Sequence, residues 1–542
     1  MTADAGAAPV AVAIRIRRPV AALSARLLRR GSVLAPALVA AYMVVEVYSY
    51  QRNYPDAASR QRLAEVSDTA ALRILQGVPH AVQTTGGFVV WDGGWVIGLS
   101  LGVWALLATA RLLRGEEDTG RAELLLAGPV PARGALITEL LVLAGSFALT
   151  GAAVAVALGA SGAGWSSSIL YGLGLAALTA AVAGLAAVAA QVMPSRRRAV
   201  GAAATALGLL FLLRTAANSS ARVGWLRWLT PYGWIDELRA FGADRWLVLL
   251  PLLAAPVLLA AGAVALRDRR DAGAGLVGGS DRHVGHGWLL GNPAAFAWRT
   301  TQPVLLGWAA AVAVYSAVLG VLVKTVVDFI AGDPTYGRIL TDFGVDLTDL
   351  TRGVVALLGG TMGVVFALYG CWRIGAVRDE EAAGRAEHLL ARTVTRAGWL
   401  GWHALLTATA TALLSVLAGV AMWTGAAVTG ADLGLTDAVG SMLAPLPAAV
   451  LFTGLAVLCF GAIPRLTVTL SVGLAVASYL LELLGTPLGL PAAVLNLSAF
   501  HHLSSVPVEP FGLLPTVALG GLGLLAAAAG VAAFRRRDLT GS

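Results

Sequence analysis

One short charged element, which carries paired glutamates and an arginine, occurs twice in the chain. It reads RGEEDTGRAELLLAGPV over 114–130 and RDEEAAGRAEHLLARTV over 378–394. At a constant offset of 264 residues, both copies keep Glu-Glu, Gly-Arg-Ala-Glu and Leu-Leu-Ala. The arginine-rich run at 266–271 similarly matches the run at 534–538. A repeat at about half the chain length predicts an internal duplication with two related surfaces.

Each copy is predicted to form one amphipathic helix, over 116–127 and over 380–391. On a helical wheel the glutamates, the glycine and the arginine share one side, and leucines take the other. Glu117 and Arg121, like Glu381 and Arg385, stand four residues apart in the order that favours an ion pair. The residues predicted to dock on a partner are Glu116, Glu117, Gly120, Arg121 and Glu123 in the first copy and Glu380, Glu381, Gly384, Arg385, Glu387 and His388 in the second.

The acidic character of this face indicates what it binds. Helices that lie on a membrane surface are rich in Lys and Arg, because the lipid surface is negative. A glutamate face therefore favours a protein partner, and a solvated loop is the alternative. The second copy lacks the Gly128-Pro129 turn and has His388 where the first has Leu124. The two docking surfaces are therefore predicted to be unequal.

Long apolar segments must position these two surfaces. Hydrophobic residues make up 57% of the 542 residues and charged residues only 13%, against the roughly 25% charged residues of soluble domains. The composition predicts an all-α polytopic membrane protein. The net charge of +8 is explained by arginines beside the apolar segments, so no nucleic-acid partner is predicted. Two cysteines far apart exclude a disulfide framework.

About twelve segments are long enough to cross a bilayer as helices. The predicted spans are 31–50, 92–112, 135–160, 168–192, 199–217 and 246–266 in the first half, and 302–327, 353–376, 399–429, 438–462, 466–485 and 512–534 in the second. The predicted domains are a six-span repeat at 1–266, a cytoplasmic linker with an interfacial helix at 267–297, and a second six-span repeat at 298–542. Because each half has an even number of spans, the repeats are predicted to be parallel.

The distribution of basic residues predicts the orientation. Tight clusters at 196–198 and 535–537 fall on the side of both termini and both charged elements, which the positive-inside rule places in the cytoplasm. Segments 218–245 and 486–511 then lie outside. Their aromatic residues, interrupted by Pro and Gly, predict short helices that re-enter the outer interface, with a plain loop as the alternative.

The chain resembles the type-2 ATP-binding-cassette (ABC) exporter permeases, in particular the large duplicated actinobacterial form described as an exporter of polyketide antibiotics or of drugs. The resemblance rests on EEDTGRAELLLAGPVPAR at 116–133 and its second copy. It implies that the segment after span 2 is a coupling helix that docks on an ATPase. It also implies an N-terminal interfacial helix at 14–30 and a re-entrant hairpin at 218–245. The expected cargo is hydrophobic drugs, antibiotics or lipid-like molecules, exported across the bacterial plasma membrane.

The chain carries no ATP-binding loop of its own. Such a loop needs Gly-Lys-Ser/Thr, and the single lysine, Lys324, follows Val323. ATP and Mg²⁺ are therefore expected on two copies of a separate ATPase subunit, and the chain itself is not expected to be an enzyme. The alternatives are a proton-coupled secondary drug transporter, which usually needs ionisable groups in mid-membrane, and a membrane enzyme or scaffold.

The sequence gives weaker signals for the residues that contact cargo. Trp95 and Trp104 in span 2, and Phe366, Tyr369 and Trp372 in span 8, could line an apolar cavity for a bulky molecule. Packing is the alternative for aromatic residues at helical spacing. No metal site is predicted, since His283 and His286 stand in a Gly-rich linker. No role is predicted for the external loops 51–90 and 328–352.

Overall fold

The computed structural model describes residues 7–118, 120–121, 127–128, 131–270, 275–277, 292–332, 349–382, 384–391, 394–485 and 490–538. Their regular secondary structure is helical, and none of them lies in a strand. Within these residues, 12 helical segments are long and apolar enough to cross a membrane, and they coincide with the predicted spans. The chain is therefore an all-α, multi-pass membrane protein.

The chain divides into two compact units, Met1–His283 and Val284–Ser542. The domain boundaries predicted at 266 and 298 stay a prediction, and most of the linker, with His283 and His286, lies outside the described residues. The spans of the first unit are helices α1 (Ala7–Asn53), α4 (Thr85–Ala110), α7 (Ala132–Ala160), α8 (Trp165–Val192), α9 (Arg196–Ser219) and α11 (Leu249–Arg267). Those of the second are α12 (Pro293–Gly332), α14 (Leu350–Ala382), α16 (Arg396–Thr429), α17 with α18 (Leu435–Leu443, Leu446–Ala462), α19 (Thr467–Gly485) and α21 (Leu513–Arg536).

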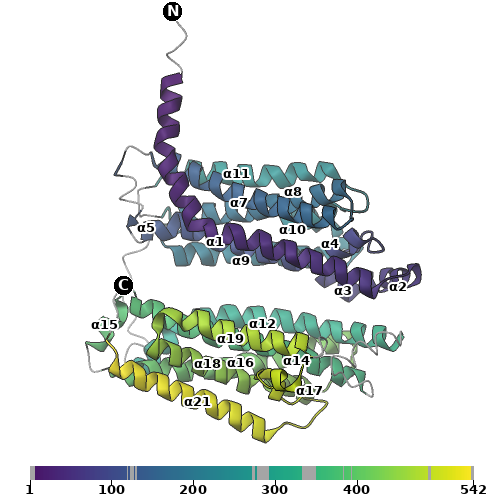
Figure 1. The fold of residues 1–542 in the computed structure, drawn as a ribbon, viewed down its shortest axis with the longest axis vertical. Coiled ribbons are helices and arrows are strands. Elements are labelled where there is room, and N and C mark those ends of the chain that lie inside the picture. The colour runs from purple at the N-terminus through teal and green to yellow at the C-terminus, as the bar shows by residue number, and fades with distance from the viewer. Residues whose placement is uncertain are drawn as a thin grey trace, which may run out of the picture. The chain divides into compact units, whose positions relative to one another are not determined.

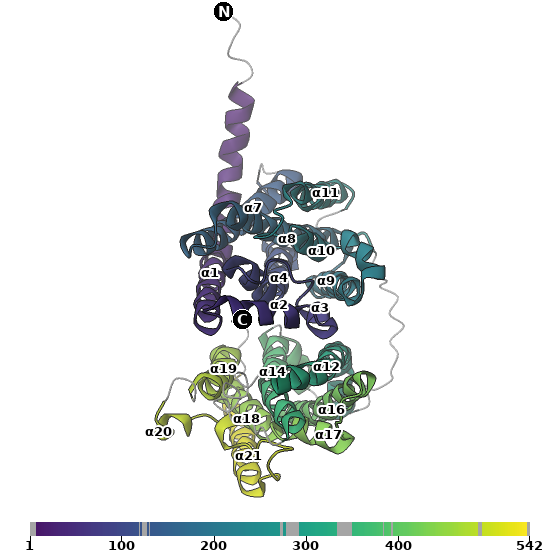
Figure 2. The same cartoon turned by 90° about the vertical axis from the view of Figure 1, so that its right-hand side faces the viewer.

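The two units share one packing order. In the first, α8 packs against α4, α7, α9 and α11; in the second, α18 packs against α14, α16, α19 and α21. Figure 2 looks along the helices and shows α8 and α18 each among their neighbours. The fourth span is thus the centre of each unit, as an internal duplication predicts.

Small residues let the central helix of the second unit approach its neighbour. Gly454 of α18 faces Gly523 of α21, and Gly461 faces Gly530. A Cβ on Gly454 would lie 2.0 Å from the carbonyl oxygen of Gly523, so no other residue fits there. Glycine at such crossings allows backbone contact, which stabilises helix pairs in lipid where no hydrophobic force acts between them.

Two helices differ from the prediction. The interfacial helix expected at 14–30 is not separate, because a single helix α1 runs through it and through the first span, with Pro19 and Pro36 inside. Figure 1 shows that α1 bends before it runs along the bundle. The tenth span is interrupted between α17 and α18, where Pro445 and Pro447 lack the N–H groups that a continuous helix needs.

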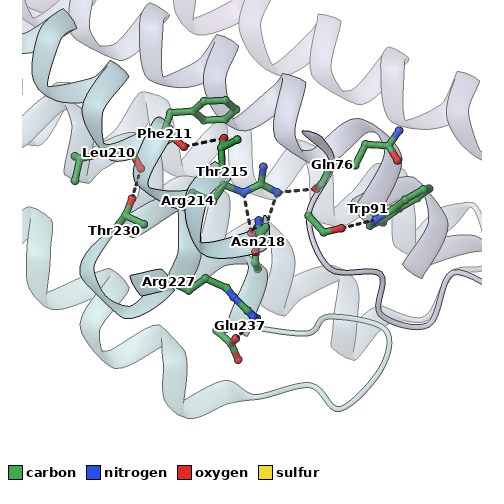
Figure 3. Close-up of polar contacts among 12 residues, drawn as sticks. Gln76, Trp91, Leu210, Phe211, Arg214, Thr215, Asn218, Arg227, Thr230 and Glu237 are labelled. Atoms are coloured by element: carbon green, nitrogen blue, oxygen red, sulfur yellow. Dashed lines mark hydrogen bonds and ion pairs between the residues drawn. The ribbon is translucent and has the colours of Figure 1, made fainter. Parts of the chain in front are cut away.

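The segment predicted to re-enter the membrane at 218–245 contains two short helices, the 3-10 helix η2 (Ala221–Leu229) and α10 (Pro231–Glu237). Tyr232 of α10 is buried, and its hydroxyl lies 3.4 Å from the carbonyl oxygen of Gly98. Arg214 of α9 donates to Asp236 at 2.7 Å and to the carbonyl of Gln76 at 2.6 Å (Figure 3). These contacts fold the segment back onto the bundle. The second segment, 486–511, contains α20 (Ala492–Leu495) and η5 (Phe500–His502).

Candidate coupling elements

The first charged element continues the second span and then turns sharply. Helix α4 runs through a five-residue π-helix, η1 (Arg111–Gly115), into α5 (Glu116–Asp118). Gly120 follows with φ +73°, and its N–H donates to the carbonyl of Glu117 at 2.9 Å. A left-handed residue ends a helix, and glycine is the residue that adopts this conformation without strain. Figure 1 shows α5 at the end of the bundle opposite to α2 (Ala57–Ser67) and α3 (Ala70–Leu75).

The second element has the same geometry. Helix α14 ends at Ala382, Gly384 has φ +71°, and its N–H donates to the carbonyl of Glu381 at 2.9 Å. A short helix, α15 (Arg385–Leu390), then begins. The prediction of one amphipathic helix over 116–127 and over 380–391 is therefore wrong. The paired glutamates end the span, and the Gly-Arg that follows at the same spacing in both copies marks a turn, which in the second copy leads into α15.

The break at Gly120 changes the predicted ion pairs. Arg121 binds Glu116, with Nε and Nη2 at 2.9 and 3.0 Å from its carboxylate oxygens, and the expected pair of Glu117 with Arg121 is not formed. Glu117 instead contacts arginines from two spans. Arg114 of η1 donates to Glu117 Oε2, and the other oxygen, Oε1, lies 2.6 Å from Arg270 and 3.5 Å from Arg267.

The cluster around Glu117 lies away from water. The side chains of Arg114, Arg267 and Arg270 are 7% exposed or less. Burial lowers the pKa of Arg270, and the hydrogen bond and charge of Glu117 act against this shift. Arg270 also donates to the side-chain oxygen of Gln191, at the end of α8, at 2.8 Å. Glu117 therefore ties the end of the second span to the end of the sixth.

The second unit makes the same connection with one arginine. Arg537, directly after α21, binds Glu381 through its two terminal guanidinium nitrogens: Nη1 lies 2.7 Å from Oε1 and Nη2 lies 2.6 Å from Oε2. The guanidinium carbon also lies 5.2 Å from the ring centre of Phe460 and 5.1 Å from that of Phe534. Glu381 is 3% exposed, so the pair is shielded from solvent. In both units the second glutamate of Glu-Glu is thus fixed to the end of the sixth span; we call the Glu117 and Glu381 contacts the first and second latch.

Other predicted docking residues remain at the surface or outside the described part. Arg121 is 63% exposed, Glu387 is exposed, and Glu380 is half-buried. Glu123 and the side chains of Arg385 and His388 lie outside the described residues, so the pair of Glu381 with Arg385 stays a prediction.

Sequence reasoning missed Asp118 and the arginines of the latches. Asp118 is exposed, and its carboxylate accepts the backbone N–H of Arg196 at 2.8 Å, at the start of α9. In the second copy Ala382 holds this position, so the link has no equivalent there. The arginines that follow the sixth span of both halves were visible as a repeated run, and this was the available signal for the latches.

The aromatic residues predicted to contact cargo differ in their surroundings within each unit. Trp95 lines a cavity in the first unit, whereas Trp104 packs edge-on against Phe147 at 5.4 Å between ring centres. Phe366 and Tyr369 are fully buried, and Tyr369 packs against Trp308. Trp372 is 43% exposed, and its ring centre lies 6.3 Å from that of Trp308. Their role in a cargo pathway stays a prediction.

Twelve candidate spans among the described residues, in two related units that each carry a turned element, define a polytopic membrane protein. A family model described as the C-terminal domain of the multidrug efflux system permease Rv1217c matches residues 63–267 and 290–535. The chain is 32% identical, over 519 residues and 94% of both chains, to the multidrug efflux system permease protein Rv1217c of Mycobacterium tuberculosis. The chain belongs to this family of multidrug efflux permeases, which confirms the recognition of a duplicated efflux permease from its sequence.

Proposed function

We propose that this permease is the membrane subunit of an ATP-driven ABC exporter. Two copies of a separate ATPase, which bind ATP and Mg²⁺, dock on the segments that follow Gly120 and Gly384. Both termini and both segments lie in the cytoplasm, and the bacterial plasma membrane is the site of action. The cargo is a hydrophobic drug, antibiotic or lipid-like molecule, in keeping with the name of its relative.

The two latches carry this proposal. A force on the segment after Gly120 acts directly on α4, because Glu117 belongs to the same continuous helix. It acts also on α11, because Glu117 is bound to Arg267 and Arg270 at the end of that span. In the second unit, Glu381 and Arg537 connect α14 with α21 in the same way. A closing ATPase pair would thereby move two spans per unit, which is the differential contact that a conformational change requires.

Docking is tested best at exposed positions, because the buried glutamates also hold the fold. We expect Arg121→Glu and Glu387→Arg, combined in one chain, to prevent co-purification with the ATPase encoded by the neighbouring gene. Drug-stimulated ATP hydrolysis should fall with it. The matched control combines Arg222→Glu and Asp432→Arg, which make the same charge changes at exposed positions on other segments of the two units. The control should retain both association and stimulated hydrolysis.

Two outcomes would contradict the proposal. One is full association of the ATPase with the docking variant. The other is drug efflux that an uncoupler abolishes while ATP remains constant, since this result indicates proton coupling instead of ATP hydrolysis.

A further inference from the structure

The second unit contains a cavity at the end of α14 that lies away from Glu381. Its volume is about 180 Å³, and it lies between α14, α17, α19 and the segment 500–508. Leu357, Leu483, Phe500 and Val506 form apolar walls, and Glu482 contributes a carboxylate. The described lining includes no arginine or lysine. The cavity thus combines apolar walls with the hydroxyl groups of Thr361, Ser441, Ser504 and Ser505 and with a single acidic group.

The first unit has a cavity at the corresponding place, but its volume is about 40 Å³. Along α4 and α14 the lining residues have the same helical spacing: Gly87, Val90, Trp91, Gly94 and Trp95 in the first unit, and Gly353, Ala356, Leu357, Gly360 and Thr361 in the second. On the fourth span, Tyr171 corresponds to Ser441. The second unit therefore has smaller side chains where the first has Trp91, Trp95 and Tyr171, and this explains its larger cavity.

The charges at the two cavities are reversed. In the first unit the fifth span supplies a cation, Arg214, which donates to Asp236 of the following hairpin at 2.7 Å. In the second unit the fifth span supplies an anion, Glu482, and the hairpin supplies His501, with Nδ1 3.1 Å from Glu482 Oε2. In the first unit, the guanidinium-bearing Arg214 thus lines the cavity.

Glu482 keeps capacity for a further partner. Among the described residues, none donates a hydrogen bond to its second oxygen, Oε1. The nearby Arg352 of α14 does not line the cavity, and its Nε lies 3.2 Å from Asp437 of α17. The Glu482 side chain is 36% exposed, so this oxygen is accessible, and a cation in the cavity gains a charge-assisted hydrogen bond from it.

We propose that this cavity binds an organic cation: a protonated amine attached to an apolar ring, with the amine at Glu482 and the ring among Leu357, Phe500 and Val506. A cavity of about 150 Å³ is known to hold benzene, so about 180 Å³ accommodates one ring with its amine. The inference rests on the proposed function only in treating this molecule as cargo. Binding to the isolated chain needs no ATPase, so each of the two proposals can fail while the other holds.

The test uses two probes of equal size, benzylammonium and benzyl alcohol, on the full chain in phosphatidylcholine nanodiscs. Ligand-observed NMR titration gives the Kd of each. We expect benzylammonium to bind more tightly than benzyl alcohol. In the Glu482→Gln variant, the Kd of benzylammonium should rise about tenfold and the Kd of benzyl alcohol should stay unchanged. Asp432→Asn, which removes an exposed acid from the same unit, should change neither Kd.

A double variant addresses the case in which Glu482→Gln disturbs the fold. Glu482→Arg with His501→Asp recreates the ion pair of the first unit, which is compatible with this architecture. The protein should keep its thermal midpoint and lose benzylammonium binding. Equal binding of benzylammonium to wild type and to this variant would overturn the proposal, as would equal affinity of wild type for the charged and the neutral probe.

Discussion

The first and second latches make the same connection with different balances of charge. In the first, one carboxylate, Glu117, faces three buried guanidinium groups. In the second, Glu381 faces one, and Arg537 also packs against the rings of Phe460 and Phe534. The first latch thus gathers three arginines around one carboxylate. The second distributes its stabilisation between an ion pair and aromatic contacts.

This difference shows that the two halves of a duplicated protein can keep the contact between the second and sixth spans while the side chains that make the contact change. Both latches join the end of the second span to the end of the sixth, through residues 153 and 156 positions apart. What is common to both is the place of the contact and the glutamate. The number of arginines and the neighbouring rings differ, so the two units should respond unequally to the same substitution.

The largest effect is expected from Glu117→Leu. This substitution removes the carboxylate that contacts Arg114, Arg267 and Arg270, and breaking a buried charge pair costs about 3–5 kcal/mol. The midpoint of thermal unfolding in detergent should fall strongly, with low yield of folded protein. Arg121→Ala, which breaks only an exposed pair on the same element, should change stability by less than about 1 kcal/mol. Equal effects of the two substitutions would refute the central role of Glu117.

A smaller effect is expected from Glu381→Leu. Only Arg537 loses its partner, its side chain is 15% exposed, and it keeps its contacts with Phe460 and Phe534. We expect a loss of about 1.5–3 kcal/mol, the range for hydrogen bonds to charged groups. Thermal unfolding of both Glu→Leu variants side by side measures the difference. If Glu381→Leu proves the more damaging, the contrast between the latches is wrong.

The spans were predictable from sequence, because about 20 apolar residues in succession have no other stable place than a membrane. The duplication was predictable too, since the charged element keeps its spacing in both copies. The latches were not, because Glu117 and Arg270 meet only through the packing of α4, α8 and α11. The turn at Gly120 and Gly384 was a missed signal: a glycine inside a helical pattern at the same place in both copies indicates a helix end.

The turns themselves should be the feature in which the units agree. Gly120→Ala and Gly384→Ala each place a side chain in the left-handed region, which costs roughly 1–2 kcal/mol. Among the described residues no atom lies within 4 Å of either added Cβ, so the expected cost is backbone strain. Thermal unfolding should show equal losses for the two variants. Gly145→Ala, in helix α7 and equally free of described neighbours, should instead raise the free energy of unfolding by up to about 1 kcal/mol.

The smallest effect is expected from Asp118→Ala, which removes a contact that only the first unit has. Its carboxylate accepts one N–H at the start of α9, and such contacts stabilise a helix start by about 0.5–1 kcal/mol. Because Ala occupies the matching position 382, the variant makes the first element like the second. The thermal midpoint should barely move, while trypsin should cleave faster after the exposed Arg121, because the turn loses one of its fixed points. Unchanged cleavage would show that the first latch alone holds the element, and the two units would then differ only in the arginines that face Glu117 and Glu381.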